Sequence, residues 1–487
     1  MLRQLKKRLL PLMDTVAELL ELLPTLSEPS VYLKDGVQAL TQIASVLEEE
    51  GEPGRQALGQ ARDLARALEK DNLDLQALLR DVRALQGEIR RLPTQLKVVF
   101  MPYKIQMWGT LASIYEAAAR DPDCIAHVVP VPYRPLHNGP NGLEAGELID
   151  EGPQFWGKAP VIPYAEYDLE REMPDVIFLH NIYDHYNTLT QVEPAYHTAQ
   201  LRQYTDMLVY VPYFVSPFFI PQPGDPEFWF GLPSLKNVDK VVLAGDFLTE
   251  PAVRFGLPRE KLLPLGSPKL DSVVRALRSP PPCPREWTER LENRTVFFLN
   301  TLYHVGGVLK VVERVLNLPE QFPNAAVIWR PHPLTEAFIR QKYPQYEPQY
   351  RALIEQIRRG QGPARHVVLD ESPDYLQAMS RADVMLSGSS SLLNTFLLTQ
   401  KPIIFLDGEM PKHSMIPPDA FHYYPEEEED WKALIQQLLQ GESPSASRKA
   451  AACIYANTDG TCGEKVYQTI SQQLGQDIHA PIPSVPN

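Results

Sequence analysis

The chain has 487 residues, which is too long for one ordinary domain and predicts two or three. Hydrophobic residues make up 44% and charged residues 22%, values typical of a globular protein with a full buried core. The formal net charge of −14 excludes a nucleic-acid backbone as the main partner, because no basic excess is present to displace counterions.

The cysteines and the hydropathy of the chain indicate its compartment. The four cysteines have no paired spacing, which favours incidental thiols in a reducing compartment. The basic start Met1–Arg8 is followed by an apolar run that Pro11 and Asp14 interrupt, unlike a signal peptide. No stretch approaches the ~20 apolar residues of a membrane span. We therefore expect a cytoplasmic protein, with peripheral attachment to the inner face of the cell membrane as the alternative.

Residues 1–95 carry helical periodicity and are predicted to form an N-terminal helical bundle. Apolar side chains recur at three- and four-residue steps, as at Leu78, Val82 and Leu85, which is the stripe of an amphipathic helix. We interpret this region as a packing or self-association module. The alternative is docking to a membrane surface through the basic residues of the first helical turn. Those residues are Arg3, Lys6, Lys7 and Arg8.

From residue 97 the pattern changes to short apolar runs separated by helix-length segments. Unalternated runs rich in Val, Ile and Leu are typical of strands in a buried parallel sheet. We therefore expect a Rossmann-like, acceptor-side domain over residues 96–278. Its predicted strands are Val98–Met101, Ala126–Val131, Val176–Leu179, Leu208–Val211, Val241–Ala244 and Leu262–Leu265.

The same pattern restarts after the proline-rich stretch Ser279–Pro284, which we interpret as a linker. A second Rossmann-like domain is expected over 285–475, and a disordered tail over 476–487. The fold class is thus α/β, a GT-B-like pair of parallel-sheet domains preceded by an all-α region. The second set of strands is Val296–Leu299, Ala326–Trp329, Val367–Leu369, Val384–Leu386 and Ile403–Leu406.

A run of serines, Ser387-Gly388-Ser389-Ser390-Ser391, follows one strand of the second domain. Ligands of open parallel sheets bind beyond the carboxyl ends of the strands. The hydroxyls and the free N–H groups of the next helical turn would form a phosphate pocket there, and the glycine would let the backbone approach closely. An ordinary serine N-cap is the alternative interpretation.

Other polar residues follow neighbouring strands of the same domain. Arg330-Pro-His332-Pro places a fixed cation and a titratable imidazole at a strand end. An arginine can clamp phosphate oxygens, and a histidine can exchange a proton near neutral pH. We interpret His332 as catalytic, with a structural histidine as the alternative, and His304 as a further donor-binding residue. Asn300, Asp370 and Asp407 also follow strands, but the sequence gives them no specific role.

The first domain offers fewer candidates. Lys104, His180, Asp184 and Tyr213 follow its predicted strands. His180 and Asp184 could hold or deprotonate an acceptor hydroxyl, or they could serve only to stitch a loop with hydrogen bonds. P-loop, G-x-G-x-x-G and zinc-binding spacings do not occur at the required places, so we expect neither a metal nor a cofactor.

Four segments together resemble the CDP-glycerol glycerophosphotransferase family, the teichoic-acid-type polymerases and primases. They are similar to the family's Gly-x-Pro-Arg-x-Asp, Arg-x-His-Pro, Ser-Asp-x-Ser-Ser and Asp-Gly-x-x-x-Glu-Arg segments, in that order. The likeness covers about residues 97–475. The four segments are Gly266-Ser-Pro-Lys269-Leu-Asp271, Arg330-Pro-His332-Pro, Ser387–Ser391 with Pro402 eleven residues later, and Thr458-Asp-Gly-Thr-Cys-Gly-Glu464-Lys.

The resemblance implies a GT-B fold, a CDP-glycerol donor in the second domain and transfer without a bound metal. Glycerol phosphate would pass to a hydroxyl of a glycan or lipid-linked acceptor, with release of CMP, in teichoic-acid-like polymer synthesis. His332 and Arg330 would then serve the donor phosphates, Ser390 and Ser391 would hydrogen-bond them, and Lys269 would replace the family's arginine on the donor side. The alternatives are a GT-B glycosyltransferase that uses a nucleotide sugar and an inactive nucleotide-binding scaffold.

The sequence departs from the family at three places. Gly388 stands where the family has an acidic residue, and Lys269 where it has arginine. The family's first-domain His-Gly-Thr-Pro is replaced by a segment that begins Tyr210-Val-Pro-Tyr. Either His180 or His185 takes over the role of base, or the chemistry differs, or the protein is inactive.

Overall fold

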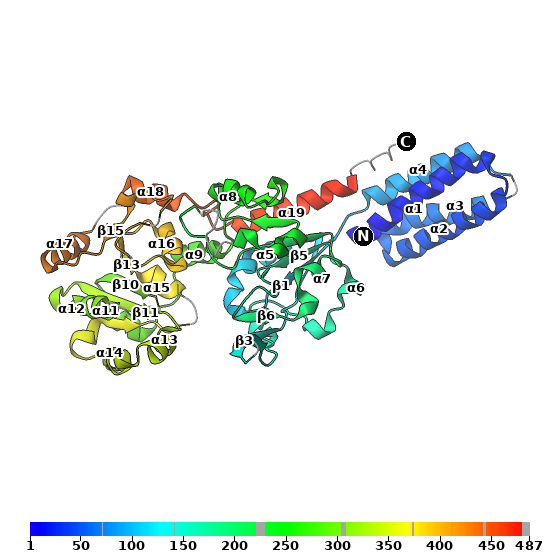
Figure 1. The fold of residues 1–487 in the computed structure, drawn as a ribbon. Coiled ribbons are helices and arrows are strands. Elements are labelled where there is room, and N and C mark those ends of the chain that lie inside the picture. Colours follow the sequence, from blue (N-terminus) through cyan, green and yellow to red (C-terminus); the bar gives the residue numbers. More distant parts are fainter. Residues whose placement is uncertain are drawn as a thin grey trace.

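The computed structural model describes residues 1–70, 72–140, 142–220, 229–302, 308–372, 375–410, 412–441 and 445–479. Three bodies follow one another along the length of the molecule (Figure 1): a helical bundle, a first α/β lobe and a second α/β lobe. The bundle is attached to the first lobe only at one of its ends. None of the helices within the described ranges combines the length and the apolarity that crossing a bilayer requires.

The N-terminal bundle consists of antiparallel helices that bury their apolar stripes against one another. Leu40, Leu47 and Leu85 are fully buried in its core, as the helical periodicity predicts. Asp74 caps the last helix by accepting a hydrogen bond from the backbone N–H of Ala77. The predicted all-α N-terminal region is therefore confirmed. Its helices are α1 (Arg3–Leu22), α2 (Pro29–Glu49), α3 (Arg55–Leu68) and α4 (Leu75–Arg91).

The basic first turn of α1 lies in the joint between the bundle and the first lobe. The Arg3 guanidinium, 1% exposed, donates to Asp175 Oδ1 at 3.1 Å and to the Asp206 carboxylate. Lys6 is also 1% exposed. Lys7, in contrast, lies at the surface, and its Nζ is 2.7 Å from Asp206 Oδ2. Because Arg3 and Lys6 are buried, they cannot contribute to the membrane-docking surface that was the alternative role of this turn.

The first lobe is built on a parallel sheet with the strand order β2-β1-β5-β7-β8-β9. Its central strands are buried on both faces, which is why their sequences are continuously apolar. The strands are β1 (Leu96–Met101), β2 (Cys124–Val128), β5 (Val176–Leu179), β7 (Met207–Tyr210), β8 (Lys240–Val242) and β9 (Leu262–Leu263). The helices are α5 (Gly109–Arg120), α6 (Leu169–Glu172), α7 (Thr198–Leu201), α8 (Thr249–Arg254) and α9 (Lys269–Arg278).

A small antiparallel sheet is inserted into the first lobe, with the order β4-β3-β6. The sequence did not predict it, because its strands contain prolines, glycines and polar residues in place of an apolar run. The strands are β3 (Tyr133–Gly139), β4 (Gly142–Ala145) and β6 (Thr190–Val192).

The second lobe repeats the plan with the strand order β12-β11-β10-β13-β14-β15, again in parallel pairs. The strands are β10 (Thr295–Thr301), β11 (Ala325–Pro331), β12 (Val367–Leu369), β13 (Val384–Ser387), β14 (Ile403–Phe405) and β15 (His422–Tyr423). The helices are α10 (Arg285–Leu291), α11 (Val308–Leu316), α12 (Leu318–Gln321), α13 (Thr335–Lys342), α14 (Glu347–Arg359), α15 (Leu376–Arg381), α16 (Ser391–Phe396), α17 (Glu428–Leu439) and α18 (Ala446–Ala452). The predicted pair of α/β parallel-sheet domains is confirmed.

The last helix, α19 (Cys462–His479), leaves the second lobe and packs on α5 of the first. Asp271 of α9 fixes its start, because its carboxylate accepts the N–H groups of Cys462 (3.1 Å) and Gly463 (2.8 Å). A Cβ added to Gly463 would lie 2.2 Å from Ser113 Oγ and 2.6 Å from the Ser113 carbonyl carbon, so only glycine fits. Residues 476–479, predicted to be disordered, belong to this helix, and 480–487 lie outside the described residues.

This joint explains two of the four family-like segments. The segment that ends at Asp271 and the one that contains Cys462 and Gly463 are distant in sequence but are hydrogen-bonded to each other. Their residues hold α19 on the first lobe. These hydrogen bonds give Asp271 a structural role that requires no contact with a ligand.

Candidate functional site

Polar side chains gather at the carboxyl ends of three adjacent strands of the second lobe. Asn300 of β10 lies in register with Arg330 of β11 on one side and with Ser387 of β13 on the other. The Asn300 Nδ2 group donates to Ser387 Oγ at 2.9 Å and to Ser390 Oγ at 3.2 Å. We call Asn300, Arg330, His332 and residues 387–391 the second-lobe edge. The predicted residues Arg330, His332 and the serines therefore share one border of the sheet.

The serines of this edge have different internal roles. Ser387 is fully buried in the hydroxyl network with Asn300. Ser390 is the N-cap of α16, since its Oγ accepts the N–H of Leu393 at 3.1 Å. Ser391 is exposed, and none of the described residues hydrogen-bonds its hydroxyl. The N-cap alternative thus describes Ser390, whereas the Ser391 hydroxyl remains available to a ligand.

An internal carboxylate already occupies part of the predicted phosphate pocket. Asp407, which follows β14, accepts the backbone N–H of Ser389 through Oδ2 at 2.5 Å. A Cβ added to Gly388 would lie 2.4 Å from Asp407 Oδ1, so this glycine makes room for the carboxylate. A phosphate that used the Ser389 N–H would have to displace Asp407 from it.

Arg330 also has an internal anion. Its Nη1 donates to Asp370 Oδ2 at 2.7 Å, and its Nη2 to the backbone carbonyl oxygen of Ser372 at 3.1 Å. The Arg330 side chain is 16% exposed and that of Asp370 fully buried. A donor phosphate would therefore share this guanidinium with a carboxylate.

His332 is held by backbone groups beside Arg330. The backbone N–H of His332 donates to the Thr301 carbonyl oxygen at 3.1 Å. The ring Nδ1 accepts the backbone N–H of Leu334 at 3.2 Å. In a neutral ring this hydrogen bond assigns the proton to Nε2. Partial burial lowers the pKa of His332 below its ordinary value of 6.5, so the ring is neutral at pH 7 and donates through Nε2.

The candidates of the first lobe are more deeply embedded. His180 is fully buried, and its Nε2 accepts the N–H of Tyr103 at 3.2 Å. Burial, with a smaller effect of the nearby Lys269 charge, lowers the pKa of His180 to about 3. Asp184 accepts both the N–H (3.1 Å) and the hydroxyl (2.7 Å) of Thr198. These contacts favour the loop-stitching interpretation of both residues and leave the exposed His185 as the accessible imidazole.

One further predicted residue differs from expectation in its location, and another is not described by the structure. Lys269, expected on the donor side, donates through Nζ to the Tyr213 carbonyl oxygen at 3.2 Å and thus belongs to the first lobe. His304 lies outside the described residues. Three strand-end residues of the second lobe that had no predicted role, Asn300, Asp370 and Asp407, make the hydrogen bonds that organise its edge.

The two lobes are in direct contact close to these residues. Asn394 of α16 donates through Nδ2 to the Ser216 carbonyl oxygen at 3.4 Å, and the Tyr455 hydroxyl donates to the same oxygen at 2.8 Å. Ser216 follows β7 in the loop that also contains Tyr213. The helix capped by Ser390 therefore packs against the loop that accepts Lys269.

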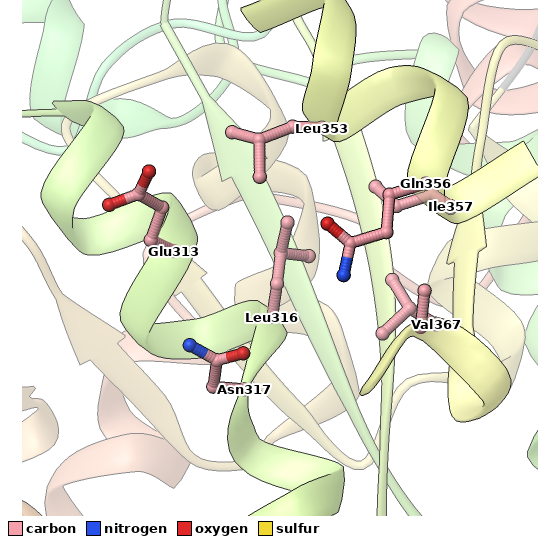
Figure 2. Close-up of a pocket in the computed structure, with 8 residues that line it drawn as sticks. Glu313, Leu316, Asn317, Leu353, Gln356, Ile357 and Val367 are labelled. Atoms are coloured by element: carbon pink, nitrogen blue, oxygen red, sulfur yellow. The ribbon is translucent and has the colours of Figure 1, made fainter. Parts of the chain in front are cut away.

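A cavity of about 240 Å³ in the second lobe lies elsewhere. It is lined by residues such as Glu313, Leu316 and Gln356 between α11 and α14 (Figure 2). Val367, the first residue of β12, lies in its wall, so the cavity is at the amino end of the strands. None of the predicted site residues lines it. Within the described ranges, His, Cys, Asp and Glu side chains form no group of three that could hold a metal ion.

Comparison with known proteins identifies the architecture. No protein-family model and no curated protein matches the sequence. The UDP-GlcNAc 2-epimerase of Neisseria meningitidis bound to UDP-GlcNAc is similar with a TM-score of 0.51 and 11% identity, over 77% of this chain and 100% of that one. The enzyme of the same name from Methanocaldococcus jannaschii gives 0.50 and 12%, over 77% and 100%. The wall teichoic acid polymerase TagF gives 0.47 and 13%, over 78% and 90%.

The chain thus has a GT-B-like fold preceded by a helical bundle. At these identities the likeness is one of fold, and chemistry has to be argued from the residues at the strand ends.

Proposed function

We propose that the protein is a transferase that moves glycerol phosphate, or a related polyol phosphate, from a CDP-activated donor to a hydroxyl of a glycan or lipid-linked acceptor, releasing CMP. The proposal combines the resemblance of the four segments with the second-lobe edge. It places the donor diphosphate at Arg330, His332 and Ser391.

One observation carries the proposal: a guanidinium, a neutral imidazole and a hydroxyl-rich helix start occupy adjacent strand ends of one parallel sheet. Phosphoryl transfer depends mainly on positioning and on stabilising charge at the phosphate oxygens. Arg330, held by Asp370, is a preorganised cation for this purpose. His332 would donate a hydrogen bond from Nε2 to a donor phosphate oxygen, and so stabilise the negative charge that develops on the departing CMP.

Titration calorimetry with CDP-glycerol, compared with UDP- and GDP-sugars, tests the donor. We expect CDP-glycerol to bind at micromolar concentration and CMP to be released when an acceptor is present. Ser391→Ala should weaken donor binding without loss of stability, because its hydroxyl has no partner among the described residues. Unchanged donor affinity in Ser391→Ala would remove this hydroxyl from the phosphate site.

A second candidate is a GT-B glycosyltransferase that uses a nucleotide sugar. The observation in its favour is that the Neisseria meningitidis neighbour, at a TM-score of 0.51, is bound to UDP-GlcNAc. Tighter binding of a UDP- or GDP-sugar than of CDP-glycerol would favour it. Binding of a nucleotide without any release of CMP or UDP would instead indicate an inactive scaffold.

A further inference from the structure

Two lysines at the strand ends of the first lobe form no ion pair with any carboxylate in the part of the chain that the structure describes. Lys104 follows β1, and its Nζ lies 4.8 Å from the centre of the Tyr133 ring and 5.4 Å from that of Tyr103. The Lys269 Nζ has the Tyr213 carbonyl oxygen as its hydrogen-bond acceptor at 3.2 Å. Among the described residues, no carboxylate forms an ion pair with either amine. Both therefore differ from Arg3 and Arg330, whose guanidinium groups are paired with aspartates.

Both amines are partly withdrawn from water. Burial lowers the pKa of Lys269, and burial also lowers the pKa of Lys104, where the charge of Glu151 partly offsets it. Glu151 is itself engaged, accepting the Tyr133 hydroxyl at 2.7 Å and the N–H of Ile105 at 2.8 Å. An incompletely hydrated cation without a paired anion is unfavourable, so an anionic ligand would be strongly attracted.

The two lysines share a neighbour, the buried His180. The Tyr103 ring, under the Lys104 amine, packs edge-on against the buried His180 at 5.5 Å. The charge of Lys269 acts on the same imidazole, lowering the pKa of His180. Both lysines therefore lie near His180, Lys104 in the loop after β1 and Lys269 at the start of α9.

Phenol groups complete this cluster. Tyr183 and Tyr213 lie with their ring centres 6.3 Å apart, and both are only partly buried. Burial raises the pKa of Tyr103 to about 12 and raises that of Tyr183 as well. Their hydroxyls are therefore neutral at pH 7 and can donate hydrogen bonds to an anion.

The start of α9 adds a further observation. This helix of 10 residues begins at Lys269, so its positive dipole end coincides with the amine. The Ser267 hydroxyl, which precedes it, is 6% exposed and has no hydrogen-bond partner in the described structure. It borders a void of about 10 Å³ shared with Ser216 and Pro268. A buried donor without a partner normally marks a missing ligand or water.

We propose that Lys104 and Lys269, with the hydroxyls of Tyr183 and Tyr213, form an anion site for a phosphate group carried by the acceptor. A tetrahedral oxyanion accepts hydrogen bonds from several directions, as donors from the loops after β1, β5 and β7 and from the start of α9 require, whereas a carboxylate accepts them near one plane. The inference rests on the proposed function: the acceptor is a phosphorylated alcohol, not a neutral glycan. Its phosphate binds in the first lobe, and the donor phosphates bind in the second.

Calorimetry of the whole protein with glycerol 3-phosphate tests this site while saturating CDP occupies the donor side. We expect Lys104→Met and Lys269→Met each to raise the dissociation constant tenfold or more. Lys432→Met, which removes an exposed lysine of α17, is the matched control and should change it less than twofold. Equal affinities in the wild type and both first-lobe variants would overturn the site.

A second measurement uses the unmodified protein. Acetylation followed by mass spectrometry should show that inorganic phosphate slows labelling of Lys104 and Lys269 but not of Lys432. Labelling of both lysines at the same rate with and without phosphate would overturn the proposal. A protein that binds CDP-glycerol but releases no CMP when an acceptor is present, yet shows phosphate protection, would disprove the proposed transferase activity and leave the anion site standing.

Discussion

The two lobes have the same parallel-sheet plan, but they differ in whether the cations at their strand ends are paired with carboxylates. In the second lobe the Arg330 guanidinium is paired with Asp370, and the Ser389 N–H with Asp407. In the first lobe Lys104 and Lys269 form no ion pair with a carboxylate among the described residues, whereas the acid at a strand end, Asp184, accepts two hydrogen bonds from Thr198.

This difference shows that topology determines where polar groups gather, but internal partners determine what they can bind. An arginine that already has a counterion is held in place, so it positions a ligand at the cost of sharing its charge. An amine without a counterion is less well anchored, but its affinity for an added anion is greater. The second lobe is thus organised before a ligand arrives, whereas in our proposal an anion completes the first lobe.

The largest effect is expected at the imidazole of the second lobe. His332→Ala should reduce the rate of CMP release by about two to three orders of magnitude, because a hydrogen bond that stabilises the charge on the departing CMP is lost. The fold should be retained, since the ring is only partly buried. His137→Ala on the remote hairpin strand β3 is the control and should be fully active. Turnover within threefold of the wild type in His332→Ala would make the histidine structural.

The pairing of Arg330 with Asp370 predicts the next largest effect, on stability. Arg330→Ala leaves the fully buried Asp370 carboxylate without its cation and should lower the free energy of unfolding by about 3–5 kcal/mol. Adding Asp370→Asn removes the unpaired charge and should restore most of that loss in urea unfolding. Donor affinity should remain low in the double variant. If it recovered with stability, Arg330 would have no direct part in binding.

Much of the fold was predictable because the sheets are buried on both faces. The runs Val176–Leu179 and Val367–Leu369 coincide with β5 and β12, since a strand covered on both sides has to be apolar throughout. β3, β4 and β6 were not predicted, because an inserted sheet with exposed residues has no such run. β15 has only two residues, too few for a pattern.

The site was predictable in its location but not in its internal chemistry. The strand-end rule brought Arg330, His332 and the serines to one edge. It could not show that Asp407 binds the Ser389 N–H, because that contact joins two loops whose distance depends on the sheet order. Likewise, Lys269 was assigned to the donor by resemblance, whereas its helix start packs on the loop of Tyr213 in the first lobe.

The serines offer a smaller and sharper test of the second-lobe edge. Ser390→Ala removes the N-cap of α16 and should cost about 1 kcal/mol of stability. Ser391→Ala should leave stability unchanged, and loss of one hydrogen bond to a charged phosphate should raise the donor dissociation constant about tenfold. Thermal unfolding and donor calorimetry on both variants separate the two roles. A destabilised Ser391→Ala with normal donor binding would reverse this assignment.

The last test concerns the pH dependence of stability that the two histidines cause. His180 has a folded pKa of about 3 against an ordinary 6.5, so between these values the unfolded chain binds a proton that the folded protein does not. The contribution of neutral His180 to the free energy of unfolding is fully present above pH 6.5. As the pH falls below this value, it decreases by about 1.4 kcal/mol per pH unit.

Replacing His180 with glutamine, whose side-chain oxygen can still accept the Tyr103 N–H, should remove this part of the dependence of the free energy of unfolding on pH. Urea unfolding between about pH 5 and pH 6.5 measures it. His332→Gln should remove less over the same range, because its partly exposed ring is more easily protonated in the folded protein than the fully buried His180. Identical slopes in the wild type and His180→Gln would mean that the first-lobe imidazole gains its proton without unfolding. The contrast between a sealed and an accessible histidine would then be lost.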